Sequence, residues 1–140
     1  MKILIAEDDL LARRLLHHIL RPYGPVDIAI DGQEAIDSYE MSWDQGAPYD
    51  LLFLDIMMPK KDGHMVLDHV REREPKWRSS DVPTGPGELR IVITTALGDS
   101  KTVISSFSEG ADFFLVKPLF TDKVEGLLKE LGAKKLQYSD

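Results

Sequence analysis

The sequence contains five short, almost wholly apolar runs separated by stretches of helical length, and this pattern limits the possible folds more than any other feature. The runs are rich in Ile, Leu, Val and Phe and lie at residues 3–6, 26–30, 50–54, 89–94 and 113–116. Apolar runs without polar alternation are typical of parallel strands that helices cover on both faces. The pattern therefore predicts an α/β fold, with a doubly wound five-stranded parallel sheet flanked by five helices.

The stretches between the runs have the periodicity of amphipathic helices. From residue 10 to residue 20 the apolar side chains recur on one helical face, and Pro22 with Gly24 ends the helix. Similar patterns predict helices over residues 33–41, 63–74, 100–109 and 121–131. The segment from Pro75 to Glu88 contains three prolines and two glycines. It is predicted to be a long loop that is either functional or disordered.

Composition excludes several classes of protein. The chain has 140 residues, 43% of them hydrophobic, which is enough for one domain with a core. Its formal net charge of −7 argues against direct nucleic-acid binding. It has no cysteine for a disulfide or a thiolate metal site, and no apolar stretch near the roughly 20 residues that span a bilayer. We therefore expect a cytoplasmic protein without a membrane partner.

Polar residues follow the apolar runs at the sheet edge where parallel α/β proteins bind ligands. They are Glu7, Asp8 and Asp9 after the first run, Asp55 after the third, Thr94 and Thr95 at the fourth, and Lys117 with Pro118 after the fifth. Clustered carboxylates repel one another unless a cation binds, and oxygen ligands without cysteine favour Mg²⁺. A lysine and a hydroxyl beside a carboxylate suit an added phosphoryl group. The edge therefore predicts phosphoryl transfer to a carboxylate.

The chain resembles the receiver domain of two-component response regulators over about residues 2–131. The resemblance rests on six segments: Ile3–Asp9, Leu51–Pro59, Asp62–Gly63, Thr95–Ala96, Gly110–Asp112 and Lys117–Pro118. Each segment alone is a weak signal, but their order and spacing make the set specific. The resemblance implies a flavodoxin-like sheet with strand order 2-1-3-4-5. It also implies one receiver domain over residues 1–140, with no output domain in this chain.

The resemblance assigns the acidic residues their roles. Asp55 would be the phosphoacceptor, and the side chains of Glu7, Asp8 and Asp55 would bind Mg²⁺. The backbone carbonyl of Met57 would be a further ligand of the ion, so the identity of its side chain would not matter. Asp9 is interpreted as the cap of the helix that follows it.

The resemblance also assigns the residues around the phosphoryl group. Thr95 would donate a hydrogen bond to one phosphoryl oxygen and Lys117 would pair with another, whereas Thr94 is interpreted as an ordinary strand residue. The bond before Pro118 is the candidate for a cis peptide. Phe114 stands at the switch position. When Thr95 moves toward the phosphoryl group on activation, it would vacate a space into which the Phe114 ring could turn. Because Phe114 has no hydroxyl, we expect the buried position to be favoured.

The resemblance also implies partners. A histidine kinase or a phosphotransfer protein would donate the phosphoryl group, and the chain would be no enzyme beyond the self-catalysed phosphorylation and dephosphorylation of Asp55. The output surface would comprise the fourth helix, the fifth strand and the fifth helix, roughly residues 101–109 and 114–128. Because the chain ends soon after that helix, the output is expected to be another protein. The chain is then either a single-domain regulator that acts by docking, as in chemotaxis, or a receiver cut from a longer protein, and the sequence leaves both open. The activated form could also pair as a homodimer.

Two other functions stay open from the sequence. A Mg²⁺-dependent phosphatase or hydrolase with an aspartyl-phosphate intermediate would have an acid two positions after Asp55, where this chain has Met57. A receiver-like binding module that works without phosphorylation would be expected to have lost Asp55, Thr95 or Lys117, and all three are present. The phosphoaccepting receiver is therefore the preferred interpretation.

Overall fold

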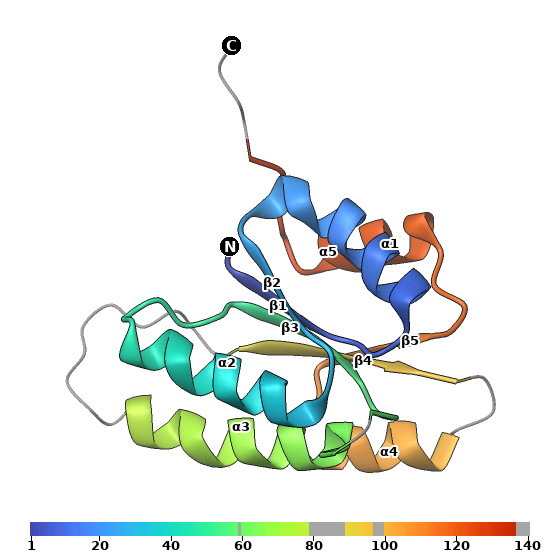
Figure 1. The fold of residues 1–140 in the computed structure, drawn as a ribbon. Coiled ribbons are helices and arrows are strands. Elements are labelled where there is room, and N and C mark those ends of the chain that lie inside the picture. Colours follow the sequence, from blue (N-terminus) through green and yellow to red (C-terminus); the bar gives the residue numbers. More distant parts are fainter. Residues whose placement is uncertain (59, 79–88, 97–99, 137–140) are drawn as a thin grey trace.

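The computed structural model describes residues 1–58, 60–78, 89–96 and 100–136, which form one sheet between two layers of helices (Figure 1). The strands are β1 (Ile3–Ala6), β2 (Val26–Ala29), β3 (Leu51–Asp55), β4 (Arg90–Thr95) and β5 (Phe113–Val116). The helices are α1 (Leu10–Leu20), the 3-10 helix η1 (Arg21–Tyr23), α2 (Gly32–Asp44), α3 (Gly63–Arg78), α4 (Ser100–Ser108) and α5 (Thr121–Glu130). The strand order is β2-β1-β3-β4-β5 and each neighbouring pair is parallel. The predicted fold class and strand order are confirmed.

Each face of the sheet has its own hydrophobic core. Alternate side chains of a strand leave the sheet on opposite faces. Ile5, Phe53 and Val92 therefore pack with α1 and α5, whereas Leu54 and Ile93 pack with α2 and α3. Figure 1 shows the same division, with α1 and α5 on one side of the sheet and α2, α3 and α4 on the other. The two layers leave the carboxyl ends of the strands together at one edge.

The two edge strands are less buried than the sequence predicts. The central strands β1 and β3 are buried throughout, and β4 is buried apart from Arg90. In β2, however, Asp27 and Ile28 are exposed, and in β5 Phe114 is exposed. An edge strand has a neighbouring strand on one side only, so the helices packed over the centre of the sheet do not cover it.

The predicted end of the third helix at Glu74 is wrong, because α3 continues through Pro75 to Arg78. Proline lacks a backbone N–H and so removes one hydrogen bond of the helix. The residue before this proline is held from outside the helix, because the buried carboxylate of Glu74 accepts the N–H of Leu89 at 2.6 Å. The rest of the predicted loop, residues 79–88, lies outside the described residues.

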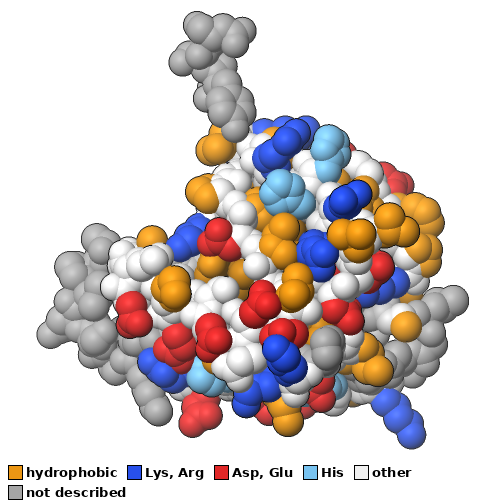
Figure 2. All heavy atoms as spheres, in the orientation of Figure 1, with side chains coloured by type: hydrophobic (Ala, Val, Ile, Leu, Met, Phe, Trp, Pro, Cys, Tyr) orange, Lys and Arg blue, Asp and Glu red, His pale blue; other side chains and the backbone are white. Residues whose placement is uncertain are grey.

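Surface charge is distributed unevenly. The sequence of α1 contains two arginines, two histidines and no acidic residue, whereas α2 contains four acidic residues and no basic one. Figure 2 shows this division on one face, with Lys, Arg and His side chains over α1 and acidic side chains over α2.

Within the described part of the chain, no helix combines the length and the apolar character needed to cross a membrane.

Candidate functional site

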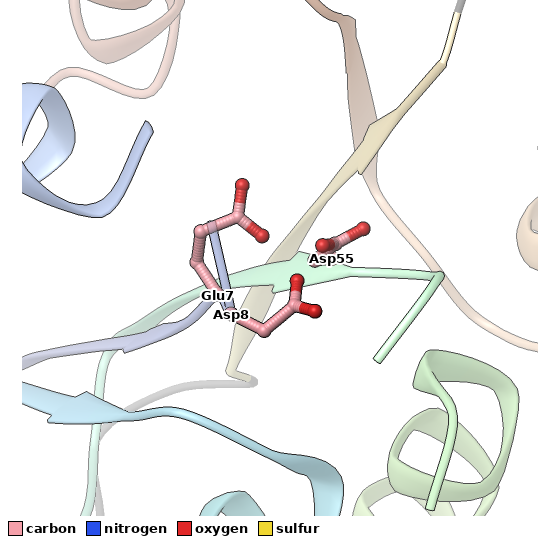
Figure 3. A group of neighbouring side chains, drawn as sticks. All are labelled: Glu7, Asp8 and Asp55. Atoms are coloured by element: carbon pink, nitrogen blue, oxygen red, sulfur yellow. The ribbon is translucent and has the colours of Figure 1, made fainter. Parts of the chain in front are cut away.

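Three carboxyl groups meet where β1 and β3 end. The two strands are parallel neighbours with Ala6 opposite Leu54, so Glu7 and Asp55 follow side by side. One oxygen from each of Glu7, Asp8 and Asp55 lies within 4.8 Å of the other two (Figure 3). Glu7 and Asp55 are only 1% and 3% exposed, whereas Asp8 is exposed. The register of the sheet therefore brings together the acidic side chains that the sequence placed at this edge.

Lys117 reaches these carboxyl groups from the end of β5. Its backbone N–H donates to the Thr95 carbonyl at 2.7 Å, and its peptide bond to Pro118 is cis. The Lys117 Nζ lies 2.5 Å from Glu7 Oε1 and 3.1 Å from Asp55 Oδ2. One ammonium group thus faces three carboxyl groups, so negative charge is in excess when all three are ionised.

The excess of acid changes the proton equilibria. Burial raises the pKa of Glu7 to about 8, and a hydrogen bond with Asp55 acts in the same direction, against the effect of Lys117. Burial also disfavours ionised Asp55, but hydrogen bonds from Glu7 and from the Met57 N–H, together with the charge of Lys117, hold the pKa of Asp55 below its ordinary value. Of the two groups, Glu7 therefore holds a proton more tightly than Asp55.

Two buried hydroxyl groups lie at the end of β4. Thr94 and Thr95 are 1% and 2% exposed, and neither Oγ1 has a hydrogen-bond partner among the residues that the structure describes. Glu7 forms an ion pair with Lys117, but neither carboxyl oxygen of Glu7 has a well-aligned hydrogen bond to any residue that the structure describes. Unsatisfied buried polar atoms are rare in proteins, and a ligand is one of the ways to satisfy them.

Helix caps and one glycine hold the surrounding loops. Asp9 accepts the N–H three residues later at 3.2 Å and caps α1, as predicted. Asp62 accepts the N–H three residues later at 3.0 Å, at the start of α3. A Cβ on Gly63 would lie 2.7 Å from the Asp55 carbonyl oxygen and 2.6 Å from Ile56 Cα. The sequence marked Asp62 and Gly63 only by resemblance, because the close backbone approach that requires glycine arises between distant segments.

The expectation that Phe114 is buried is wrong for this conformation. The side chain is 45% exposed, and its ring meets that of Phe107 on α4 edge to face, with centroids 5.8 Å apart. Because β5 is an edge strand, the core does not enclose this position. The contact with Phe107 gives the ring an aromatic partner outside the core.

The donor set fits Mg²⁺. Hard cations prefer carboxylate and carbonyl oxygens, and three acidic groups close together need positive charge beyond that of Lys117. Asp55 Oδ1 is fixed by the Met57 N–H at 3.0 Å, and both Glu7 oxygens lack a well-aligned hydrogen bond within the described chain. Glu7, Asp8 and Asp55 could therefore hold the ion. That the backbone carbonyl of Met57 is a further ligand of the ion stays a prediction.

Comparison with known proteins identifies the family. Residues 3–129 match the response regulator receiver domain. The chain belongs to this family. The resemblance seen in the sequence is thereby confirmed, and of the three functions that the sequence left open, membership favours the receiver of a two-component phosphorelay.

Known relatives include proteins of two kinds. The chain is 34% identical over 131 residues to the probable transcriptional regulator ycf27 of Cyanophora paradoxa, covering 93% of this chain and 47% of that protein. It is 30% identical over 135 residues to the osmosensing histidine protein kinase SLN1 of Saccharomyces cerevisiae, covering 95% and 10%. The chain thus spans less than half the length of these curated relatives.

Solved structures of receiver proteins share the fold. The CheY protein in a CheX-CheY-BeF3-Mg+2 complex from Borrelia burgdorferi has a TM-score of 0.77 and 28% identity, covering 96% of this chain and 90% of that one. A putative response regulator from Chloroflexus aurantiacus has a TM-score of 0.74 and 27% identity, covering 93% and 95%.

Proposed function

We propose that this receiver domain accepts a phosphoryl group on Asp55 in a Mg²⁺-dependent reaction and then changes the surface that it offers to a partner. The observation that carries the proposal is the convergence of Glu7, Asp8 and Asp55 with Lys117, whose Nζ lies 3.1 Å from Asp55 Oδ2. Phosphoryl transfer requires that the reacting groups be held in position and that the negative charge of the phosphoryl group be neutralised. Three carboxyl groups able to hold a cation, with a lysine beside them, meet both requirements. The printed description of the Borrelia structure, with BeF3 and Mg+2, supports the same chemistry.

Each side chain has a defined part in the transfer. An oxygen of Asp55 attacks phosphorus and forms an O–P bond, while the bond from phosphorus to the donor breaks and the donor leaves with the electron pair. Lys117 pairs with one phosphoryl oxygen, and the buried Thr95 hydroxyl donates to another. Glu7, Asp8 and Asp55 would hold Mg²⁺, which when bound would supply the remaining positive charge.

The donor is proposed to be a histidine kinase or a phosphotransfer protein in the cytoplasm. Two of the relatives are histidine kinases, of which this chain covers only 7% and 10%, as a receiver segment would. Beyond the self-catalysed gain and loss of the phosphoryl group, we propose no enzymatic activity.

The output surface is proposed to be the face formed by α4, β5 and α5. Three apolar side chains there are well exposed: Ile104 at 68%, Phe107 at 41% and Phe114 at 45%. Exposed apolar side chains gathered on one face are typical of a protein-binding surface. A second protein, or a second copy of the activated chain, would cover this face.

Intact-mass measurement after incubation with Mg²⁺ and a small acyl phosphate tests the proposal. The wild type should gain one phosphoryl group and Asp55→Asn none. Asp62→Asn removes an acid outside the carboxyl cluster and should still be labelled. Labelling of Asp55→Asn would place the acceptor elsewhere. If no protein is labelled and beryllium fluoride with Mg²⁺ does not bind either, the proposal is wrong.

A further inference from the structure

The start of α2 contacts the segment that joins β3 to α3. The described part of this segment, residues 56–58 and 60–62, is called here the β3–α3 segment, and it follows Asp55 directly. The Lys60 Nζ lies 3.4 Å from Asp31 Oδ2, and the side chain of Asp31 is only 6% exposed. Asp31 also caps α2, because its other carboxylate oxygen accepts the Glu34 N–H at 2.8 Å. The first turn of α2 is thus joined to the residues that follow the proposed phosphoacceptor.

A glycine brings the two backbones together at this contact. Gly32 is the first residue of α2, and a Cβ at this position would collide with the backbone carbonyl group of Lys61. The helix itself is fixed, because Ala35 and Ile36, three and four positions later, are buried in the hydrophobic core. If position 32 had a side chain, the β3–α3 segment would therefore be the part that moves.

The backbone of the β3–α3 segment is strained where it meets α2. Lys60 has a φ of 67°, and in the described part of the chain it is the one residue other than glycine with a positive φ. This left-handed conformation is unfavourable for a residue that has a Cβ, and it persists only where surrounding contacts fix it. The ion pair with Asp31 and the close packing of Lys61 on Gly32 are contacts of this kind.

The same segment orients the carboxylate of Asp55. The Met57 N–H donates to Asp55 Oδ1 at 3.0 Å. Ile56, the residue between them, is buried in the core, and its carbonyl accepts the N–H of Gly63, the first residue of α3, at 2.9 Å. The segment is therefore short and tied at both ends, so a displacement at Lys61 is transmitted to Met57 and to its bond with Asp55.

We propose that Gly32 is a positioning residue for the phosphorylation site, and the inference rests on the proposed phosphorylation of Asp55. By letting α2 touch the β3–α3 segment, Gly32 keeps the Met57 N–H where it orients Asp55. The ion pair between Asp31 and Lys60 acts in the same direction, because it holds the segment against α2. Ligands that are oriented by outer contacts bind metal ions more tightly, and a well-placed carboxylate attacks phosphorus faster.

The test compares Mg²⁺ binding by the wild type and by Gly32→Ala, measured by titration calorimetry on the folded proteins. Gly32→Ala should bind Mg²⁺ about 10- to 100-fold more weakly, which is the usual effect of losing an outer contact of a metal ligand. Hydrogen exchange without Mg²⁺ gives a second measurement: the Met57 N–H should exchange faster in Gly32→Ala than in the wild type. A purely structural role would lower the melting temperature and leave the Mg²⁺ affinity of the folded protein unchanged.

Gly126→Ala is the matched control. Gly126 lies inside α5, and a Cβ there would meet no atom within 4 Å. The variant should melt at a higher temperature than the wild type, because alanine favours a helix more than glycine does, and it should keep the wild-type affinity for Mg²⁺. Equal affinities of the wild type and folded Gly32→Ala would overturn the inference. A similar loss of affinity in Gly126→Ala would also overturn it, because the contact at position 32 would then not be the cause.

Lys60→Gly decides the question if Gly32→Ala does not fold. Glycine adopts the left-handed conformation without strain, so the fold should be kept, but the ion pair with Asp31 is lost. Removal of a positive charge would by itself favour a bound cation. We nevertheless expect Mg²⁺ binding to weaken, by about threefold, because the segment is no longer held against α2. Unchanged or tighter binding in Lys60→Gly would then overturn the inference.

Failure of the proposed function gives a different result. If the wild type itself binds no Mg²⁺ and gains no phosphoryl group from a small acyl phosphate, the proposed function is wrong, and the role of Gly32 falls with it. If the wild type and Gly126→Ala bind Mg²⁺ and Gly32→Ala binds it weakly, the proposed function and the inference are both supported.

Discussion

Two clusters of charge lie at opposite ends of the sheet, and they differ in how completely their polar atoms are paired. At the amino end of β4, Arg71 of α3 donates to Glu74 at 2.6 Å, to Asp112 at 2.9 Å and to a backbone carbonyl at 2.9 Å. Glu74 and Asp112 in turn accept the backbone N–H groups of Leu89 and Ile91. This cluster joins α3, β4 and the turn before β5. Its charged side chains have their ion-pair and hydrogen-bond partners within the protein itself.

The cluster at the carboxyl end has the opposite balance. Lys117 faces three carboxyl groups, and the described chain supplies no hydrogen-bond partner for the hydroxyls of Thr94 and Thr95. Both clusters contain one cation and several acids, so the presence of buried charge does not identify the site. What differs is that one cluster is complete without a ligand and the other is not.

Removing the cation of the complete cluster should have the largest effect. Arg71→Ala removes the ion pair between Arg71 and the buried Glu74, and we expect a loss of about 3 to 5 kcal/mol in the free energy of unfolding, measured with urea. Arg73→Ala is the control, because Arg73 is 38% exposed and pairs with Glu40. It should cost less than about 1 kcal/mol. Similar losses in both variants would contradict the structural role of Arg71.

Mg²⁺ should stabilise only through the incomplete cluster. At a concentration 100 times its Kd, a ligand that binds the folded state alone adds about 2.7 kcal/mol. We expect this gain in the wild type, a smaller gain in Asp8→Ala, and the full gain in Arg71→Ala under conditions where that variant is folded. Thermal unfolding with and without Mg²⁺ measures it. Equal gains in the wild type and Asp8→Ala would exclude Asp8 as a ligand.

Without Mg²⁺, stability should fall as the pH rises toward 8. The pKa of Glu7 is about 8 in the folded protein and about 4.3 in an unfolded chain, so between these values the unfolded state binds fewer protons. We expect a loss of about 1 to 3 kcal/mol between about pH 6 and pH 8, measured by urea unfolding. Glu7→Gln has no proton to lose there, and its stability should change less. The same slope in both proteins would contradict the raised pKa of Glu7.

Asp55→Asn should have the smallest effect, and its sign is informative. The substitution removes one acid from the cluster, so ionised Glu7 can pair with Lys117 without repulsion from Asp55. We expect a gain of about 1 kcal/mol near pH 8 without Mg²⁺, again by urea unfolding. A loss would show that the contacts of Asp55 with Lys117 and the Met57 N–H outweigh the repulsion.

Much of the fold could be predicted because its signals are local. The run Leu51–Asp55 is apolar throughout and becomes a central strand, and the apolar stripe of Leu10–Leu20 gives α1 its bounds. The helix end at Glu74 was missed because Pro75 is a strong local stop signal. The contact between Glu74 and Leu89 is made across 15 residues and is invisible to any local pattern. The exposure of Phe114 was missed because burial depends on which strands become edges.

Residue type and spacing alone predict the strand–helix order, the acidic residues that follow the strands and the resemblance to receiver domains. These are properties of residue type and spacing, which a chain carries before it folds. Which charges are paired, by contrast, depends on how the folded chain brings distant segments together. Arg71 and Lys117 are both basic residues near acids, yet one completes its cluster and the other does not. Pairing depends on distances between segments far apart in the chain, and those distances are fixed only when the sheet assembles.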